Sequence, residues 1–355
     1  MVSLEEFLSE WHDDSPTLLV HTSGSTGQPK PMLVEKRHME ASARITCRFL
    51  GLKEGDRALL CLPLDYIAGK MMVVRALTCG LQLVSVAPSG HPLDTGGLDT
   101  GGQSLCNPLR SSHKGQSPFI DFAAMVPLQV WNSLQVPAER ERLKAIRHLI
   151  IGGGAIDADL AAALAGFPHH VWSTYGMTET LSHIALRRLN GPERSDWYTP
   201  FDGVKVSVNE DGCLVIDAPA VHDGVLVTND IAELERPLQK GSVGREGVRF
   251  RILGRKDNVI CSGGVKIQTE QVEALLRPHL HIPFMITKAP DQRLGQQVVL
   301  LTESADTEAL QTVCRQVLPR YWQPRRIVCV SRLPMTETGK PARAEAERLV
   351  QCINA

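Results

Sequence analysis

The feature that most constrains the fold is an alternation of short apolar runs with helical patterns over residues 58–174. The apolar runs cover residues 58–62, 82–87, 119–125, 148–151 and 171–174, and the helical patterns cover residues 68–79, 126–134 and 157–165. Parallel strands need crossover connections, which are usually helices. We therefore expect an α/β domain with a mostly parallel sheet covered by helices. A further apolar run at residues 17–21 precedes a helix over residues 35–50 that should end at Gly51.

The pattern changes from about residue 200. Short runs with turn signals between them, at residues 204–208, 213–216, 225–227 and 231–234, predict a smaller β-rich subdomain. Beyond residue 257, three strands (282–288, 296–302, 326–330) mix with three helices (269–277, 306–318, 341–352). This last segment predicts a small α+β domain. A chain of 355 residues is long enough for two domains of about 150 residues or more each.

Charge and cysteine content exclude several classes. Lysine and arginine number 38 against 39 acidic residues, a net charge of −1, which argues against a nucleic-acid binder with a broad basic face. The apolar runs are too short to span a bilayer. Residues 3–6 (SLEE) form a capping box that predicts a short amphipathic helix and not a signal peptide. The nine cysteines contain no C-x-x-C pair, so we expect reduced thiols in a cytoplasmic protein and no zinc site.

Residues 89–118 differ from their surroundings. They are rich in glycine, serine, aspartate and histidine, and the sequence LDTGG occurs at 93–97 and again at 98–102. The composition is typical of a flexible surface insertion, with a lid over a site as the alternative.

The first chemical motif is TSGSTGQPK, which follows the apolar run at residues 17–21. Its glycines allow close approach of the backbone to an anion, its hydroxyl groups donate hydrogen bonds, and a lysine ends it. A simple turn is the alternative. The order is not that of the P-loop NTPases, which excludes a P-loop kinase or GTPase. It resembles the phosphate loop of the acyl-adenylate-forming superfamily of acyl-CoA synthetases, peptide-synthetase adenylation domains and luciferases. The residues are Thr22, Ser23, Gly24, Ser25, Thr26, Gly27 and Lys30.

Two further motifs resemble the nucleotide site of that superfamily. The resemblance places Gly153, Gly154 and Ala155 of the GGGA sequence against adenine, where missing side chains leave room for a flat base. In the sequence YGMTET it gives Tyr175 and the adjacent Gly176 to adenine binding. The same resemblance makes Thr178 a phosphate contact and Glu179 the Mg²⁺ ligand, and a carboxylate is the ligand type that this ion prefers.

The next motifs resemble the ribose site, the hinge and the coenzyme A tunnel. In the sequence TND, asparagine replaces the usual glycine, and Asp230 would accept hydrogen bonds from both ribose hydroxyls. In GRKD, Arg255 would contact ribose or phosphate, and Asp257 would be the hinge residue. Gly263 and Gly264 would line the tunnel for pantetheine. The implied organisation is an adenylation domain over residues 1–254, a hinge over 255–257 and a mobile carboxy-terminal domain over 258–355.

A lysine near the carboxy terminus completes the implied catalytic set with Thr178 and Glu179. The sequence PMTETGK resembles the superfamily's P-x-x-x-x-G-K loop, and Lys340 would bridge the substrate carboxylate and the α-phosphate. The resemblance implies two steps: a carboxylate attacks the α-phosphorus of MgATP and releases pyrophosphate, and coenzyme A then displaces AMP. The implied substrates and cofactors are ATP, Mg²⁺, coenzyme A and a carboxylic acid.

Residues 62–77 indicate which carboxylic acid is the substrate. Here Tyr66 stands where a histidine is frequent, and the run resembles o-succinylbenzoate–CoA ligases of menaquinone biosynthesis. That acid carries a second carboxylate, which needs a cation or several donors. Arg75 is our main candidate, because an arginine within an apolar helix is costly unless it is paired. An internal ion pair of Arg75 with an aspartate or glutamate is the alternative. Lys70 and His183 are weaker candidates, and His183 also fits a hydrogen-bonded wall residue.

The resemblance leaves one departure and two rival functions. Most relatives carry a long segment before the phosphate loop, which here starts at residue 22. A shortened amino-terminal subdomain would expose a flank that another subunit could cover, so we expect a homo-oligomer. The rivals are a ligase or adenylating enzyme for another aryl or short acyl acid, and a non-catalytic nucleotide-binding protein. The simultaneous presence of Glu179, Asp230 and Lys340 argues against the second rival.

Overall fold

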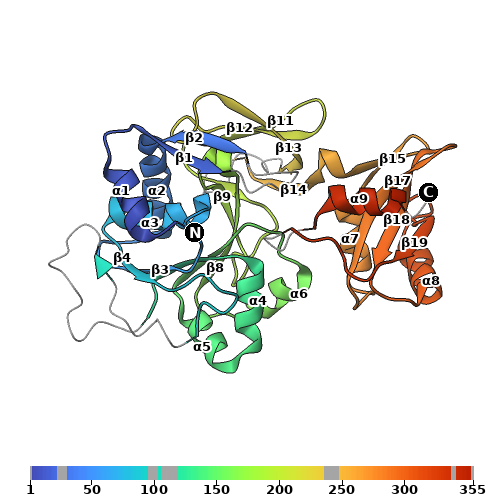
Figure 1. The fold of residues 1–355 in the computed structure, drawn as a ribbon, viewed down its shortest axis with the longest axis horizontal. Coiled ribbons are helices and arrows are strands. Elements are labelled where there is room, and N and C mark those ends of the chain that lie inside the picture. The colour runs from blue at the N-terminus through green and yellow to red at the C-terminus, as the bar shows by residue number, and fades with distance from the viewer. Residues whose placement is uncertain are drawn as a thin grey trace.

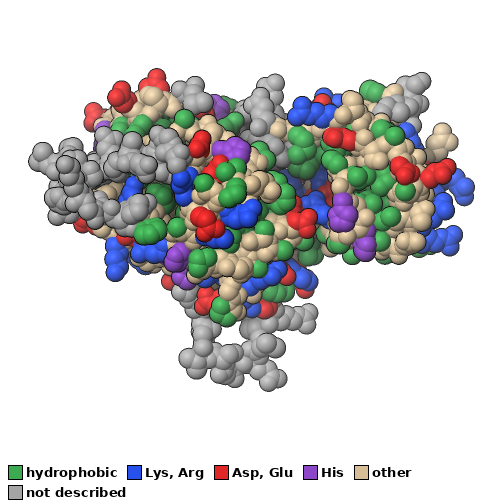
Figure 2. All heavy atoms as spheres, turned by 90° about the horizontal axis from the view of Figure 1, so that it is seen from below, with side chains coloured by type: hydrophobic (Ala, Val, Ile, Leu, Met, Phe, Trp, Pro, Cys, Tyr) green, Lys and Arg blue, Asp and Glu red, His purple; other side chains and the backbone are tan. Residues whose placement is uncertain are grey.

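The computed structural model describes residues 2–21, 30–94, 103–104, 119–235, 248–336 and 341–352. In the described part of the chain, a larger domain contains the amino terminus and a smaller domain contains the carboxy terminus (Figure 1). Figure 2 shows charged side chains of both signs scattered over the visible face of both domains, as the near-zero net charge predicts. Among the described residues, no helix is both long enough and apolar enough to cross a membrane.

The larger domain is built on a mixed sheet with the strand order β10-β9-β8-β7-β6-β3-β4-β5. Its middle strands are parallel, as predicted, and its outer strands are antiparallel. The parallel strands are β3 (Arg57–Leu60), β4 (Gln82–Ser85), β6 (Phe122–Met125), β7 (His148–Ile151) and β8 (His170–Gly176). The antiparallel strands are β5 (Gln103–Ser104), β9 (His183–Arg188) and β10 (Thr199–Pro200). β6 and β7 are buried along their whole length, which explains why they read as continuous apolar runs.

Helices cover this sheet where the sequence predicts them. They are α1 (Leu4–His12), α2 (Lys36–Leu50), α3 (Ile67–Cys79), α4 (Pro127–Gln135), α5 (Pro137–Ala145) and α6 (Ala158–Leu164). The capping box is present at α1, where Ser3 and Glu6 each accept a hydrogen bond from the other's backbone N–H. α2 ends at Gly51 in the left-handed conformation (φ +67°), which glycine adopts without strain. The sequence analysis missed α5, because its residues are mostly polar and charged and leave no apolar stripe.

The β-rich subdomain is an antiparallel sheet in the order β11-β12-β13-β14. Its strands are β11 (Lys205–Val208), β12 (Cys213–Asp217), β13 (Val225–Leu234) and β14 (Phe250–Arg255). One prediction was wrong here, since residues 225–227 and 231–234 belong to a single strand, with an irregularity between Ile231 and Ala232. The polar TND sequence interrupts the apolar pattern, and around it the pairing with β12 passes from Val227 to Ile231 while the pairing with β14 begins at Asp230. A separate hairpin of β1 (Thr17–His21) and β2 (Pro31–Glu35) flanks the TSGSTGQPK motif.

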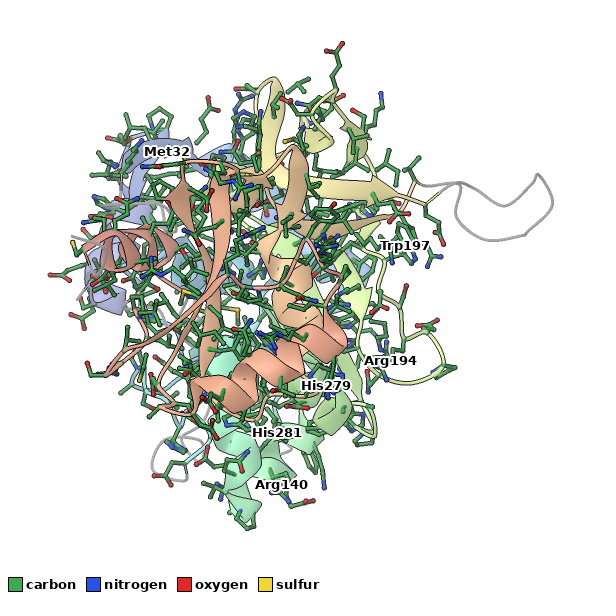
Figure 3. The ribbon with its side chains drawn as sticks, turned by 90° about the vertical axis from the view of Figure 1, so that its right-hand side faces the viewer. Met32, Arg140, Arg194, Trp197, His279 and His281 are labelled. Carbon is green, nitrogen blue, oxygen red and sulfur yellow. The ribbon has the colours of Figure 1, made fainter. Side chains whose placement is uncertain are left out.

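The carboxy-terminal domain has a five-stranded sheet and three helices. The strands are β15 (Val259–Ser262), β16 (Val265–Gln268), β17 (Phe284–Asp291), β18 (Gly295–Thr302) and β19 (Arg326–Cys329), and the helices are α7 (Thr269–Leu276), α8 (Thr307–Val317) and α9 (Arg343–Cys352). Gly263 and Gly264 form the turn between β15 and β16, with φ of +57° and +82°. Figure 3 looks onto this domain from its outer side, with His279 and His281 labelled in the α7–β17 connection. Its apolar clusters are separate from the core of the larger domain, which supports the proposed boundary.

Candidate active site

Several of the predicted site residues that are described lie at the carboxyl ends of the parallel strands β7 and β8. Along the chain, β4 is added on one side of β3, and β6 is then added on the other side. Ligands of open α/β sheets bind outside the carboxyl ends of the strands where the strand order reverses in this way. The GGGA and YGMTET sequences follow or end β7 and β8, close to this point.

The GGGA sequence provides a surface without side chains. A Cβ on Gly152 would lie 2.3 Å from the Thr174 hydroxyl oxygen of the neighbouring strand. Gly153 has a φ of +78°, and residues 153–155 are exposed to solvent. The backbone is therefore open where Gly153, Gly154 and Ala155 are predicted to lie against adenine.

Tyr175, Asp230, Arg255 and Asp257 come together at one place. The buried Tyr175 hydroxyl donates a 2.7 Å hydrogen bond to Asp230 Oδ2, and the Tyr175 ring packs edge-on against Phe250. Burial and the neighbouring Asp230 carboxylate raise the pKa of Tyr175 above its usual value. Asp230 lies opposite Arg255 in the β13–β14 ladder, with 3.5 Å between Asp230 Oδ1 and Arg255 Nη1. Arg255 also contacts Asp257, at 3.4 Å.

One hydrogen-bond donor in this cluster is not used by the described residues. The Arg255 Nε atom is buried and has no hydrogen-bond partner in the described part of the protein. Buried donors are normally paired, so an unpaired one indicates a place for a ligand oxygen. Ribose and phosphate oxygens are acceptors of the required kind. The direct contact of Tyr175 with Asp230 was not predicted from the sequence, because 55 residues separate them.

The YGMTET sequence ends β8 and turns sharply. Its last three residues form the 3-10 helix η1 (Thr178–Thr180), and Leu181 follows with a φ of +64°. A leucine in this region of backbone space is strained, and such strain persists where the surroundings enforce it. A Cβ on Gly176 would lie 2.2 Å from the Ser182 carbonyl oxygen, so no side chain fits at this crossing. The turn therefore holds Ser182 and Glu179 in fixed positions.

Glu179 fits the predicted role of a metal ligand. Its side chain is half-buried, and its carboxylate makes no hydrogen bond or ion pair with the described residues. A carboxylate with free oxygens beside buried Thr178 suits a magnesium ion that also binds phosphate oxygens.

Arg75 is held in a buried polar cluster between α2, α3 and β9. Its side chain is 1% exposed, and Nη2 donates a 2.7 Å hydrogen bond to Ser182 Oγ. Nη1 has only Met72 Sδ at 3.9 Å, and Nε has no partner among the described residues. Burial lowers the pKa of Arg75 to about 10, so the guanidinium is charged at neutral pH. The alternative of an internal ion pair does not hold in the described part of the chain, where no carboxylate contacts this guanidinium.

His183 lies in the same cluster as a hydrogen-bonded wall residue. Its Nδ1 is 3.1 Å from Ser182 Oγ, and its Nε2 is 3.2 Å from Thr46 Oγ1. Sequence analysis missed Ser182 and Thr46. A weak signal exists for Thr46, because Ser42 and Thr46 place two small polar residues on the buried face of α2.

Lys70 and Tyr66, the other two candidates for the acid site, lie at the start of α3. The buried Lys70 ammonium lies 5.2 Å from the centre of the Phe7 ring and 4.0 Å from a Glu10 oxygen, so it faces α1. Tyr66 precedes the first residue of α3 and is half-buried. In the described part of the chain, neither residue forms a hydrogen bond or ion pair with Arg75, Ser182 or His183.

Part of the predicted site lies outside the described residues. This applies to Thr22, Ser23, Gly24, Ser25, Thr26 and Gly27 of the phosphate loop and to Lys340. Lys30 is described and is exposed just before β2. Gly263 and Gly264 are exposed in the smaller domain, and whether they line a coenzyme A tunnel stays a prediction.

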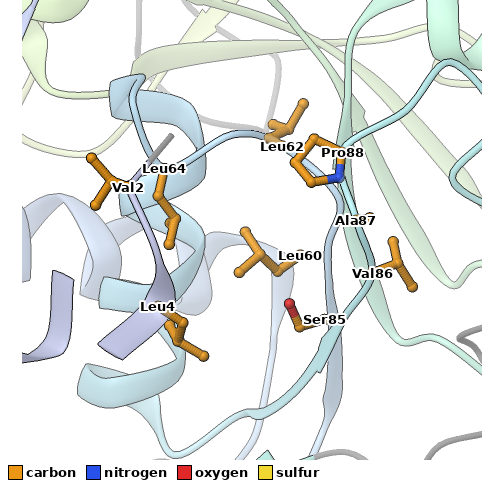
Figure 4. A pocket seen from close by; sticks show the side chains of 9 residues that line it. All are labelled: Val2, Leu4, Leu60, Leu62, Leu64, Ser85, Val86, Ala87 and Pro88. Carbon is orange, nitrogen blue, oxygen red and sulfur yellow. The ribbon is translucent and has the colours of Figure 1, made fainter. Parts of the chain in front are cut away.

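A separate cavity of about 220 Å³ lies at the carboxyl ends of β3 and β4 (Figure 4). The side chains that line it are apolar except for that of Ser85, and Val2 and Leu4 approach it from the amino terminus. The cavity contains none of the predicted site residues.

The chain matches the family model of the AMP-binding enzymes over residues 4–227. It belongs to the AMP-binding enzyme family. A probable 2-succinylbenzoate–CoA ligase of Mycobacterium tuberculosis is 28% identical, with 96% of this chain and 86% of the relative covered. The 2-succinylbenzoate–CoA ligase of a Geobacillus species is 26% identical, with 97% and 71% covered.

Solved structures of this family share the fold. An acyl-CoA synthetase (AMP-forming)/AMP-acid ligase II-like protein from Dyadobacter fermentans is 33% identical, with a TM-score of 0.60 and coverage of 96% of this chain and 92% of that one. The Bacillus subtilis o-succinylbenzoate CoA synthetase in complex with its acyl-adenylate intermediate is 23% identical, with a TM-score of 0.68 and coverage of 92% and 68%. The predicted fold class is thus confirmed.

Proposed function

We propose that this member of the AMP-binding family is an AMP-forming acid–CoA ligase whose acid is 2-succinylbenzoate. The observation that carries the choice of acid is the buried guanidinium of Arg75, which has no carboxylate partner among the described residues. An unneutralised buried cation is strongly unfavourable, so it points to an anionic ligand. After one carboxylate of 2-succinylbenzoate has reacted, the other remains to pair with Arg75. The names of the curated relatives support the same acid.

The residues at the strand ends would bind the nucleotide. The open backbone of the GGGA sequence and the Tyr175 ring would hold the adenine, while Asp230 and Arg255 would bind the ribose and phosphate oxygens. Bound through Glu179, Mg²⁺ would neutralise charge on the phosphates. Because Thr178 lies buried in the same turn, its hydroxyl group would contact a phosphate oxygen.

The smaller domain would supply Lys340 and the coenzyme A site. We propose the domain boundaries 1–254 and 258–355 with a hinge at 255–257, where β14 ends and the 3-10 helix η2 (Lys256–Asn258) leads into β15. Lys340 would stabilise the charge that develops as the acid attacks the α-phosphorus. The small domain would then turn about Asp257, and the coenzyme A thiol would displace AMP from the adenylate.

Product analysis tests the reaction and the acid together. Purified protein mixed with MgATP, coenzyme A and 2-succinylbenzoate should form AMP, pyrophosphate and the coenzyme A thioester, detected by chromatography and mass spectrometry. Benzoate and succinate, each carrying part of the acid, should give little product. Turnover of a different aryl or short acyl acid would keep the reaction and discard this substrate. Nucleotide binding without turnover of any acid would favour the non-catalytic alternative.

We also propose a cytoplasmic homo-oligomer. Leu19 and Leu33 lie directly opposite each other on the β1–β2 hairpin and are 50% and 68% exposed, which makes this face suited to a second copy of the chain. Sedimentation velocity at micromolar concentration should show a species larger than the 38.9 kDa monomer, and a monomer would contradict the proposal.

A further inference from the structure

The hydrogen bonds around His183 define where each proton lies. Thr46 Oγ1 lies 3.1 Å from the Ser42 carbonyl oxygen, which can only accept, so the Thr46 hydroxyl donates its proton there. Thr46 Oγ1 must therefore accept from His183 Nε2, at 3.2 Å, and Nε2 carries a proton. A neutral imidazole has one N–H group, which leaves Nδ1 as an acceptor. Ser182 then donates its hydroxyl proton to Nδ1 at 3.1 Å.

His183 remains neutral in this environment. It is 6% exposed, and burial together with the Arg75 charge places the pKa of His183 well below its ordinary value. Its other neighbours carry no charge: Thr46 on α2, Ser182 beside it, and the Phe201 ring at 5.4 Å. An imidazolium would donate from both nitrogens, so Ser182 would have to accept from two cations at once.

We infer that His183 is a positioning residue for Arg75, and that through Ser182 it makes the acid site selective for a carboxylate on the part of the acid that does not react. Because the Ser182 proton is bound by His183, Ser182 Oγ accepts from Arg75 Nη2 and fixes the orientation of the guanidinium. The donors on Nε and Nη1 remain without an oxygen partner among the described residues. The Ser182 hydroxyl already donates its proton to His183 and has none left to donate to the acid. The acid therefore meets the N–H donors of the Arg75 cation, which bind a carboxylate more strongly than a neutral acceptor.

This inference rests on the proposed function, and a comparison of two acids tests it. The acids are 2-succinylbenzoate and its analogue with the unreactive carboxylate replaced by a primary amide, and the readout is the ratio of their kcat/KM values. His183→Leu should lower the preference for the carboxylate about tenfold or more, mainly through KM, as expected for a misplaced charge-assisted hydrogen bond. His183→Asn keeps an acceptor near the Nδ1 position and should restore most of the preference. His38→Leu, which removes another buried histidine of the larger domain, should leave the ratio unchanged.

A second measurement determines the protonation state of His183 in the absence of substrate. ¹⁵N NMR of the full-length protein with labelled histidine, with the signal assigned by its absence in His183→Asn, should show a neutral ring protonated at Nε2 at pH 7. An imidazolium or an Nδ1–H tautomer at that pH would overturn the inference. So would an equal loss with both acids in His183→Leu, because a purely structural role predicts no change in the ratio. If the wild-type enzyme converts neither acid, the proposed function fails, and the NMR result still decides the role of His183.

Discussion

At the scale of single residues, the site is marked by groups that break the usual rules of burial. Arg75 is a charged side chain with 1% exposure and no carboxylate partner in the described structure, and Leu181 has a left-handed backbone. Each of these costs stability, and such costs persist in proteins mainly where function requires them. The two residues lie on opposite sides of Ser182, one in contact with its hydroxyl group and the other next to it in the chain.

Replacing Arg75 should separate stability from substrate binding. Arg75→Met keeps the unbranched aliphatic part of the side chain and removes an unpaired buried charge, so the free energy of unfolding should stay the same or rise. The KM for 2-succinylbenzoate should rise roughly 10- to 100-fold, the effect of losing a charged hydrogen bond of about 1.5–3 kcal/mol. Steady-state kinetics and chemical denaturation measure the two effects.

Arg75→Lys is the matched control for charge. It restores the positive charge but not the planar fork of donors, so its KM should fall between those of Arg75→Met and the wild type. The KM for ATP should not change in either variant. A strongly destabilised Arg75→Met protein, or an unaltered KM for the acid, would contradict the assignment of Arg75 to the acid site.

At the scale of elements, the two ends of the parallel strands have different tasks. The carboxyl ends of β7 and β8 carry the nucleotide motifs, while their amino ends carry a pair of histidines. His148 and His170 lie opposite each other in the ladder, with their rings stacked at 5.0 Å. Burial, followed by the charges of His170 and Arg147, lowers the pKa of His148 to about 4, and burial also lowers the pKa of His170. This end of the sheet is therefore stable only while its histidines are neutral.

The histidine pair should make stability depend on pH. The pKa of His148 is lower in the folded protein than in the unfolded chain, so between pH 6.5 and pH 4 the unfolded state binds more protons. The stabilising contribution is complete above pH 6.5 and is lost as the pH falls toward 4. Urea denaturation at pH 7, 5.5 and 4.5 should show that the free energy of unfolding falls less with pH in His148→Gln than in the wild type. His279→Gln removes an exposed histidine, and its free energy of unfolding should fall with pH as much as that of the wild type. The same pH dependence of unfolding in all three proteins would refute the role of His148.

At the scale of the whole molecule, the two domains have separate cores and polar contacts between them. Arg277 of the small domain lies 3.6 Å from Asp157 at the start of α6, and Lys256 of the proposed hinge lies 2.7 Å from Asp211 of the larger domain. The side chains of both pairs are 38–56% exposed, and such ion pairs contribute little to stability. Interfaces of this kind permit the domains to move relative to each other, as the proposed two-step reaction requires.

Lys340→Ala should therefore affect the two half-reactions unequally. If Lys340 acts only in the first step, the variant should lose most of its pyrophosphate-forming activity, by roughly 10²-fold or more, as expected for removal of a group that stabilises transition-state charge. Conversion of preformed acyl-adenylate and coenzyme A into thioester should change much less. Single-turnover assays of each half-reaction provide the measurement. Equal losses in both would argue against a domain that alternates between two positions.

The sequence by itself determined the features that depend on local patterns. Period and composition located the strands β3, β4, β6, β7 and β8 and most of the helices, because a buried parallel strand and its crossover helix have distinct apolar patterns. Local chemistry also fixed the cap at Ser3 and the stop at Gly51. The motifs predict the residues of the nucleotide site, since their order along the chain resembles that of the family.

Only the tertiary structure decided what depends on contacts between distant segments. β13 is one strand because it pairs with β12 through residues 225–227 and Ile231 and with β14 through residues 230–234, on either side of the polar residues that interrupt the apolar pattern. Lys70 and Arg75 are five residues apart and so lie on different faces of α3, but only the structure shows that one faces α1 and the other Ser182. The arrangement of Arg75, Ser182, His183 and Thr46 joins three elements. Its chemistry arises from burial, which removes water and leaves each proton a single available partner.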